Sequence, residues 1–289
     1  MANTLSCIEE HVLEIINDLF DENSTKIIGR KLLNLAQSLY VLCRIHEAIR
    51  YGHSVTKRSI FYGNTELFGS QSMVDKFLAQ FCQSFQVPRW KLHVKATDKL
   101  RIYGDLTWRD PASLALIMQS ATTEAAGFPD GDLELIEISC SARFILVVEK
   151  DAVFQKLLNN EFYEHFKPCL FVTAKGYPDL KTRYLLSTIQ SKYPSTPIFG
   201  LFDADPHGIG VYCTYKYGTT NPSMQDTAQM PIRIGSMIQI GLLPTELASM
   251  PIPQSQTSTI SRGDHSLLNG IKNRAYYQDD KHLMTQVNA

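Results

Sequence analysis

The chain lacks the sequence features of several large protein classes. Its six cysteines include no Cys-x-x-Cys pair, which argues against a zinc module and against a secreted disulfide framework and favours a reducing compartment. Its net charge is only −1, so any surface for nucleic acid must be local. No apolar run approaches membrane-spanning length, and residues 1–10 lack the basic segment and apolar core of a signal peptide. We therefore expect a soluble intracellular protein without a membrane partner.

The sequence does contain two short apolar runs that each end in acidic residues. Phe144–Val148 is followed by Glu149, and Ile198–Phe202 is followed by Asp203 and Asp205. Such runs predict buried parallel strands, whose carboxyl ends lie at one edge of the sheet. An extended Asp-x-Asp also points both carboxylates to the same side of the strand. We therefore expect the three carboxylates to meet at one rim.

Three neighbouring carboxylates repel one another unless a cation neutralises them, which predicts a site for a hard metal ion. Mg²⁺ fits best, because it prefers oxygen ligands and is usually held by one or two carboxylates together with substrate phosphates. The alternative is a helix cap or a solvated turn, and for Glu149 alone this alternative is favoured. It weakens for the aspartate pair, which Pro206, His207 and Gly208 follow. For His207 itself, a turn role is favoured over proton transfer.

Three amphipathic helices are predicted before residue 90, because apolar residues recur there at helical spacing. They cover about Ile8–Leu19, Leu32–Ile49 and Ser70–Phe85. In Arg89–Lys95 the period changes, and basic or polar residues alternate with apolar ones as on a half-buried strand. Between Lys57 and Arg101, eight Lys or Arg stand against three Asp or Glu. Helices followed by a basic strand favour a winged-helix module with a phosphate-binding surface, although a merely solvated sheet face is an equal alternative.

From residue 144 onward, helical patterns alternate with strand-like runs at Phe144–Val148, Cys169–Thr173 and Ile198–Phe202, which predicts a mainly parallel sheet flanked by helices. Residues 112–132 have weak periodicity and contain Gly127, Pro129, Gly131 and several small residues, so we expect a seam between two domains there. From Pro251 the composition becomes polar without a clear apolar stripe, which predicts a mobile tail. The predicted fold class is therefore a multi-domain α/β protein.

Tyr62 is a candidate nucleophile in the first domain. A neutral phenol reacts poorly unless a cation stabilises its phenolate. Arg58 lies four residues upstream, one turn away if the segment is helical. An aromatic pair such as Phe61-Tyr62 before a turn is more often part of a core, so spacing alone favours packing over catalysis.

Taken together, these segments resemble the eukaryotic meiotic DNA double-strand-break transesterases, which are relatives of the topoisomerase VI A subunit. The likeness covers roughly Leu32 to Leu247. It rests on Thr56–Tyr62 with Leu67-Phe68, Val147–Phe154 and Asp203–Gly208, with weaker support from Gly176–Asp179, Thr182-Arg183 and Gly241–Pro244. Blocks in this order and spacing are specific together, whereas any single block is weak.

The resemblance implies a role for each candidate residue. Tyr62 would attack DNA from a winged helix similar to that of the catabolite activator protein, with Arg58 beside it. Glu149, Asp203 and Asp205 of a Toprim domain would hold Mg²⁺. Contacts to DNA are expected from Lys57, Arg89, Lys91 and Lys95. Two departures are visible: Ser59 replaces the family's usual aspartate, and the tail has no clear counterpart of the family's closing helices.

The expected domains combine the resemblance with the composition of the linker and the tail. They are an N-terminal helix for a partner contact in 1–28, the winged helix in 29–110, a linker in 111–135, the Toprim domain in 136–250 and a polar tail in 251–289.

The implied activity is cleavage of double-stranded DNA in the nucleus through a 5′-phosphotyrosyl link, which initiates meiotic recombination. A homodimer is expected, in which Tyr62 of one protomer works with the acids of the other. A topoisomerase VI B-like ATPase subunit would dock near Val12 and Leu39, and other recombination-initiation proteins would join. The alternatives are a Toprim nuclease or primase, the A subunit of an ATP-dependent strand-passing type IIB topoisomerase, and a short isoform that binds DNA or partners without cutting.

Overall fold

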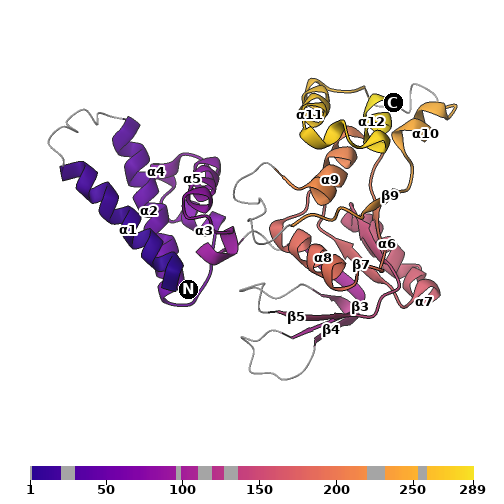
Figure 1. Cartoon of the computed structure of the whole chain (residues 1–289), viewed down its shortest axis with the longest axis horizontal. Coiled ribbons are helices and arrows are strands. Elements are labelled where there is room, and N and C mark those ends of the chain that lie inside the picture. Colours follow the sequence, from indigo (N-terminus) through magenta and orange to yellow (C-terminus); the bar gives the residue numbers. More distant parts are fainter. Residues whose placement is uncertain are drawn as a thin grey trace. The chain divides into compact units, whose positions relative to one another are not determined.

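The computed structural model describes residues 2–20, 30–95, 99–109, 119–126, 136–219, 232–252 and 259–289. The chain divides into two compact units (Figure 1). Unit 1 holds the chain up to Asp98, and unit 2 holds Lys99–Gly218 and Ile232–Ala289. In the described part, no helix has both the length and the apolar character needed to cross a membrane.

Unit 1 is helical, as its apolar periodicity predicts. The three predicted amphipathic helices are confirmed as α1 (Ala2–Phe20), α2 (Arg30–Arg50) and α5 (Gln71–Ser84). Two short helices, α3 (Lys57–Tyr62) and α4 (Thr65–Phe68), lie between α2 and α5 in the chain. One apolar core joins them, with fully buried side chains from α2, α3 and α5 including Val41, Ile45, Ile60 and Leu78. This core fixes α3, which carries Tyr62 at its end.

The expected strand over Arg89–Lys95 is wrong in most of its length. Residues Arg89–Leu92 form a 3₁₀ helix, η2, and only β2 (Val94–Lys95) is extended, pairing in parallel with β1 (Val55–Thr56). Pro88 directly before the turn and His93 in the left-handed region, at φ 56°, begin and end this 3₁₀ turn. Arg89 is only 6% exposed, so the strand with one cationic face does not form.

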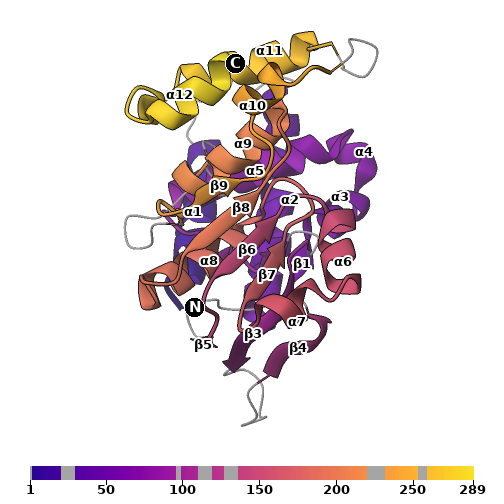
Figure 2. The same ribbon diagram turned by 90° about the vertical axis from the view of Figure 1, so that its right-hand side faces the viewer.

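Unit 2 contains a seven-stranded sheet in the order β4-β3-β7-β6-β8-β9, with β5 also pairing with β3. The three predicted parallel strands are confirmed and lie side by side in Figure 2. The strands are β3 (Arg101–Arg109), β4 (Gln119–Ala126), β5 (Glu137–Cys140), β6 (Ile145–Val148), β7 (Leu170–Thr173), β8 (Ile198–Leu201) and β9 (Ile238–Ile240). Strands β6 to β9 are parallel, and β3 joins β7 antiparallel.

Helices cover both faces of this sheet, with α6 (Asp151–Asn159) on one face and α8 (Leu180–Lys192) on the other (Figure 1). All four residues of β6 and of β7 are buried, which is why these strands read as continuous apolar runs. The remaining helices of this unit are α7 (Phe162–Phe166), α9 (Pro206–Tyr217), α10 (Pro244–Ser249), α11 (Arg262–Lys272) and α12 (Lys281–Asn288).

The division between the units differs from the predicted linker. It falls after Asp98, because β3 already belongs to the sheet of unit 2. Within the expected linker 111–135, residues 119–126 form β4, and the others lie outside the described residues.

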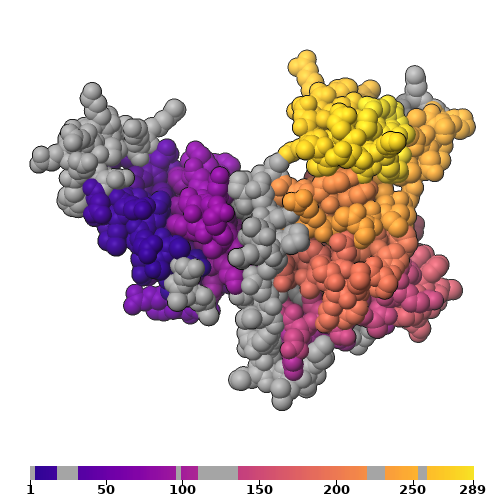
Figure 3. All heavy atoms as spheres, in the orientation of Figure 1, coloured from indigo at the N-terminus to yellow at the C-terminus, as the bar shows by residue number. Residues whose placement is uncertain are grey.

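The prediction of a mobile polar tail is wrong for its described residues. They form the helices α11 and α12, which bury Ile271, Leu283 and Val287. In Figure 3 the yellow C-terminal residues form one continuous mass with the orange residues before them. Asp280 anchors this segment to α9, because it accepts hydrogen bonds from the Lys216 ammonium (3.0 Å) and the Tyr217 hydroxyl. Because polar contacts of this kind produce no apolar periodicity, the sequence pattern did not reveal that the tail is packed.

Asp280 is expected to stabilise unit 2 through its charge. Burial alone would raise its pKa, but hydrogen bonds from Tyr217, the Leu283 N–H and Lys216 outweigh burial and lower the pKa from 3.8 to about 2. Because the pKa of Asp280 is lower in the folded chain than in the unfolded chain, its carboxylate stabilises the fold at any pH well above 3.8. This stabilisation is lost as the pH falls from about 3.8 toward 2. Asp280→Asn should cost roughly 2 kcal/mol at pH 7, and the difference should shrink near pH 3.

Denaturant unfolding of the full chain at both pH values checks this. Asparagine keeps the N-cap hydrogen bond from Leu283, so the change isolates the charge. Asp279→Asn, at the exposed neighbouring residue, is the control and should be neutral. Equal stability of Asp280→Asn and wild type at pH 7 would contradict the assignment.

Candidate active site

Unit 2 brings two of the three predicted acids together at the carboxyl ends of neighbouring strands. β6 and β8 pair in parallel with Val148 opposite Leu201. The next residue, Glu149, continues this pairing by donating its N–H to the Leu201 carbonyl at 3.1 Å. The Glu149 Oε2 then accepts a hydrogen bond of 3.0 Å from the Asp203 N–H. The register of the two strands therefore sets the distance between these acids.

Asp205 begins α9. Its Oδ1 accepts a hydrogen bond of 2.7 Å from the Gly208 N–H, so it is the N-cap of the helix, with Pro206 in the first turn. Gly208 is required by close approach, because a Cβ built there would lie 2.1 Å from the Asp203 carbonyl oxygen. The helix thus begins directly against the backbone that carries Asp203.

The charges around Glu149 are only partly balanced. Burial raises the pKa of Glu149, and the negative charges of Asp203 and Asp205 raise it further, against the lowering effects of the Asp203 N–H and of Lys150. The Lys150 ammonium forms an ion pair with Asp203 Oδ2. That hydrogen bond and the charge of Asp203 raise the pKa of Lys150. One lysine therefore faces three carboxylates.

Within the described residues, no group of three or more His, Cys, Asp and Glu side chains is arranged to hold a metal ion. Glu149 and Asp203 lie together, whereas one Asp205 oxygen is used by the start of α9. The donor set still fits Mg²⁺, because its side-chain donors are carboxylates and one or two of them normally suffice together with phosphate oxygens. Burial and then the charges of Asp203 and Asp205 raise the pKa of Glu149, and a cation bound beside these carboxylates would stabilise their ionised forms.

A third segment at this rim was not predicted. The loop after β7 reaches Glu149, whose carbonyl accepts a hydrogen bond of 2.9 Å from the Gly176 N–H. Lys175 has a left-handed backbone, at φ 53°, and its ammonium lies 3.3 Å from Asp151 Oδ2. Asp151 Oδ1 is buried without a hydrogen-bond partner. Sequence reasoning missed both residues, although Asp151 lies within a block that carries the resemblance.

His207 lies at the start of α9 and contacts two neighbours. Its Nε2 is 3.7 Å from Asp264 Oδ1 of α11, and its ring meets the Tyr177 ring edge-on with centroids 6.2 Å apart. Asp264 was missed because it belongs to the segment that was expected to be mobile. These contacts make His207 part of the joint between α9 and α11.

In unit 1, Tyr62 is the last residue of α3 and its side chain is 70% exposed. Arg58 lies one turn earlier on the same helix and is also exposed. Among the described residues, neither side chain makes a hydrogen bond or ion pair; the Tyr62 ring contacts only Phe61, at 5.3 Å between centroids. Phe61 packs against the core and Tyr62 does not, so the phenol and the guanidinium are both open to a ligand.

Ser59 holds the start of α3. Its N–H donates to Thr56 Oγ1 and its Oγ accepts from the Thr56 N–H, both at 2.9 Å, which is a reciprocal capping box. The Ser59 hydroxyl therefore accepts the hydrogen bond from the Thr56 N–H that an aspartate at this position could also accept.

The residues expected to contact DNA are only partly available. Lys57 forms an ion pair of 2.5 Å with Asp75, and Arg89 is buried. Lys91 and Lys95 are half-buried. The basic surface predicted from alternation is thus smaller than the sequence suggests.

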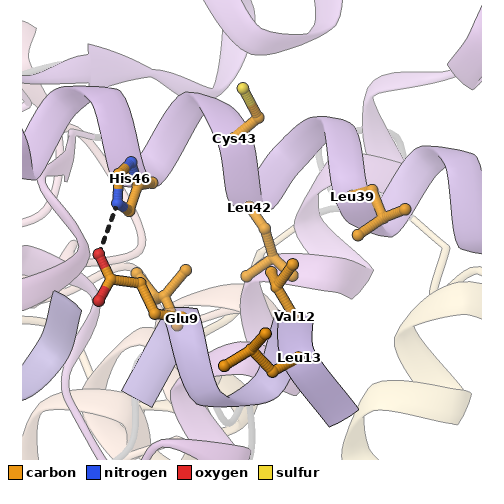
Figure 4. Close-up of a pocket in the computed structure, with 8 residues that line it drawn as sticks. Glu9, Val12, Leu13, Leu39, Leu42, Cys43 and His46 are labelled. Carbon is orange, nitrogen blue, oxygen red and sulfur yellow. Dashed lines mark hydrogen bonds and ion pairs between the residues drawn. The ribbon is translucent and has the colours of Figure 1, made fainter. Parts of the chain in front are cut away.

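The predicted partner site near Val12 and Leu39 coincides with an apolar groove between α1 and α2 (Figure 4). Its lining residues include Ile8, Leu13 and Leu42. At one end His46 Nε2 lies 3.2 Å from Glu9 Oε1, which joins the two helices.

Comparison with known proteins gives matches over both units. The Toprim-domain family of the topoisomerase 6 A-subunit/Spo11 proteins matches residues 144–289, and the family described as Type IIB DNA topoisomerase matches residues 33–94. The first match includes the tail, for which no clear family counterpart was expected. Toprim domains generally bind Mg²⁺.

Curated relatives agree with these family matches. The meiotic recombination protein SPO11 of Mus musculus is 34% identical over 86% of this chain and 61% of its own length. SPO11 of Homo sapiens is 32% identical over 82% of this chain and 59% of its own length. The A3 subunit of DNA topoisomerase 6 from Oryza sativa subsp. indica is 34% identical over 74% of this chain and 47% of its own length. The chain spans about three-fifths of the length of the two SPO11 proteins.

Gly208→Ala is expected to disturb the acidic rim. A Cβ there would overlap the Asp203 carbonyl, so backbone must move, at a cost of about 1–3 kcal/mol. Thermal unfolding should show a lower midpoint for this variant. Gly270→Ala in α11 is the matched control, because nothing lies within 4 Å of the added Cβ and alanine favours a helix. Equal midpoints for the two variants would contradict the close approach.

Proposed function

The chain belongs to the topoisomerase 6 A-subunit/Spo11 family, and on this premise we propose that it is a DNA-cleaving transesterase that makes double-strand breaks and so initiates meiotic recombination. The observation that carries the proposal is the exposed Tyr62 hydroxyl one helical turn from the exposed Arg58, with no competing partner among the described residues. The names of the SPO11 relatives support the meiotic role.

The reaction exchanges one phosphodiester for another. The Tyr62 oxygen forms a bond to the phosphorus as the bond from phosphorus to the 3′ oxygen breaks. The phenol loses its proton and the departing 3′ oxygen takes one up, so the DNA 5′ end becomes joined to the protein. Because no water is consumed and the two diesters are similar in energy, the cleavage step needs no ATP.

Arg58 has two roles in this reaction. Its guanidinium binds the scissile phosphate and favours the phenolate form of Tyr62. Both roles require that the two side chains share one face of α3. The capping box between Thr56 and Ser59 fixes the start of that helix, which keeps the pair in register.

Glu149, Asp203 and Asp205 would hold the Mg²⁺ of the Toprim domain. When bound, Mg²⁺ stabilises negative charge on the phosphate and on the leaving oxygen. The protein's own contribution is the parallel register of β6 and β8, which supplies Glu149 and Asp203 side by side. Asp205 also starts α9 at this rim, through one of its two carboxylate oxygens.

A double-strand break requires two nucleophiles, which a symmetric homodimer on double-stranded DNA supplies. Tyr62 and the acids belong to different compact units, so each site can combine Tyr62 of one protomer with the acids of its partner. Lys57, Arg89, Lys91 and Lys95 of unit 1 are proposed to contact the DNA backbone, which for Arg89 requires exposure of a side chain that is buried in the structure. The proposed partners are a topoisomerase VI B-like ATPase subunit with other recombination-initiation proteins, and the nucleus is the proposed location.

A second candidate function is that of the A protein in an ATP-dependent strand-passing topoisomerase. It is supported by the likeness to the A3 subunit of DNA topoisomerase 6. Relaxation of supercoiled DNA that depends on ATP and on a B-like subunit would favour this candidate. Breaks that stay open with protein on their 5′ ends would favour the transesterase that initiates recombination.

Tyr62→Phe should abolish covalent DNA-protein adducts, by at least about a hundredfold, because phenylalanine has no nucleophilic oxygen. The full chain is incubated with labelled duplex DNA, Mg²⁺ and the B-like subunit, then denatured and treated with nuclease to reveal label on the protein. DNA retention without denaturation should stay unchanged.

Tyr51→Phe is the matched control, because Tyr51 is 71% exposed in the same unit. It should form adducts at the wild-type level. Persistent adducts with Tyr62→Phe would assign the nucleophile to another residue, and cut DNA with protein-free ends would indicate a nuclease instead.

A further inference from the structure

Lys150 occupies an unusual place for a lysine, directly after a predicted metal ligand and paired with another. It is the residue between Glu149 and the first turn of α6. Its side chain is 59% exposed, yet the ammonium turns to the rim and pairs with Asp203 Oδ2. Among the described residues, Asp203 is therefore the group that holds this ammonium at the rim.

The Lys150 ammonium lies beside three carboxylates that have few hydrogen-bond donors of their own in the described part of the chain. Among the described residues, the Asp203 N–H is the group that donates to Glu149 Oε2, and the Gly208 N–H donates to one Asp205 oxygen. The Lys150 ammonium pairs with the carboxylate of Asp203, which lies between Glu149 and Asp205 in the sequence. A cation on Asp203 lowers the repulsion felt by Glu149 as well.

We propose that Lys150 is an exchangeable counterion, whose ammonium neutralises Asp203 when no metal is bound and leaves that carboxylate when Mg²⁺ binds. This inference rests on the proposed function of the acidic rim. The ammonium can move away without unfolding α6, because more than half of the side chain is exposed to solvent. Lys150 would thus influence the metal site through Asp203 without being a ligand itself.

The exchange has two physical consequences. In the metal-free protein the ion pair holds the rim together, because three carboxylates alone would repel one another. For Mg²⁺ the same ammonium is a competitor, because the incoming ion must replace it at Asp203 and meets its repulsion until it has moved. Lys150 should therefore stabilise the metal-free chain and weaken Mg²⁺ binding.

The structure contains a matched control at the same rim. Lys175 also pairs with a carboxylate, Asp151, at 3.3 Å, and it is likewise partly exposed. Asp151 is not one of the proposed ligands. Removing the charge of Lys175 changes the net charge of the rim as much as removing that of Lys150, but it leaves Asp203 paired. A comparison of the two variants separates the specific ion pair from a general change in charge.

The test measures Mg²⁺ binding to the full chain by isothermal titration calorimetry, without DNA. Lys150→Gln should bind Mg²⁺ roughly tenfold more tightly than wild type, as expected for removal of one adjacent positive charge. Lys175→Gln should remain within about twofold of wild type. Lys150→Arg keeps the charge and should remain near wild type.

A second readout is thermal unfolding with EDTA and with saturating Mg²⁺. In EDTA, Lys150→Gln should unfold at a lower temperature than wild type and than Lys175→Gln. Saturating Mg²⁺ should raise the unfolding temperature of Lys150→Gln more than that of wild type or of Lys175→Gln, because the ion then supplies the missing positive charge. Unchanged or weaker Mg²⁺ binding by Lys150→Gln would overturn the inference, as would equal gains for Lys150→Gln and Lys175→Gln.

Glu149→Gln distinguishes this failure from failure of the proposed metal site. If wild type binds Mg²⁺, Glu149→Gln binds it weakly and Lys150→Gln binds it like wild type, the acidic rim stands and only the counterion role fails. If Glu149→Gln binds as well as wild type, or if neither wild type nor Lys150→Gln binds Mg²⁺, the proposed site and the inference both fail.

Discussion

The parallel pairing of β6 with β8 is the constraint on which the acidic rim depends. Val148 lies opposite Leu201, so the chain leaves both strands at the same level, and Glu149 extends the pairing by one more hydrogen bond. A shift by one residue would turn Glu149 to the other face of the sheet. Because β6 is buried on both faces, such a shift would also disrupt the packing of its apolar side chains. The apolar core therefore fixes the relative positions of residues that lie 54 positions apart in the chain.

Each unit prepares its own chemistry locally. In unit 1 a capping box begins α3, and this short helix presents Arg58 and Tyr62 on an exposed face. In unit 2 the close approach of Gly208 to Asp203 begins α9 at the end of β8. Each arrangement is built from residues of its own unit. This is compatible with the proposed composite site, whose two halves would come from different protomers.

The elements that were predicted correctly are those whose burial is simple. The runs at 144–148, 169–173 and 198–202 lie largely in the interior, so their composition alone marks them as strands. Strand β3 alternates buried and less buried residues from Ile102 to Trp108, yet its residues were predicted to belong to the winged-helix domain 29–110. A similar alternation at Arg89–Lys95 gave a wrong prediction of a strand, because the residues after Pro88 form a 3₁₀ turn. An alternating pattern alone therefore does not distinguish a strand from such a turn.

The site shows the same limit at the level of side chains. Sequence motifs predicted Glu149, Asp203 and Asp205 as metal ligands, yet they did not show that Lys150 pairs with Asp203 or that Asp205 caps a helix. Nor did they reveal Asp264, which reaches His207 from α11. That helix belongs to a segment with few apolar residues, held to α9 partly through Asp280 and its partners Lys216 and Tyr217. Because α9 begins at Asp205 and is held near its end by Asp280, the C-terminal helices restrain the same helix that the acidic rim requires. The tail is thus part of what keeps the rim in place, for a physical reason that hydrophobic periodicity does not record.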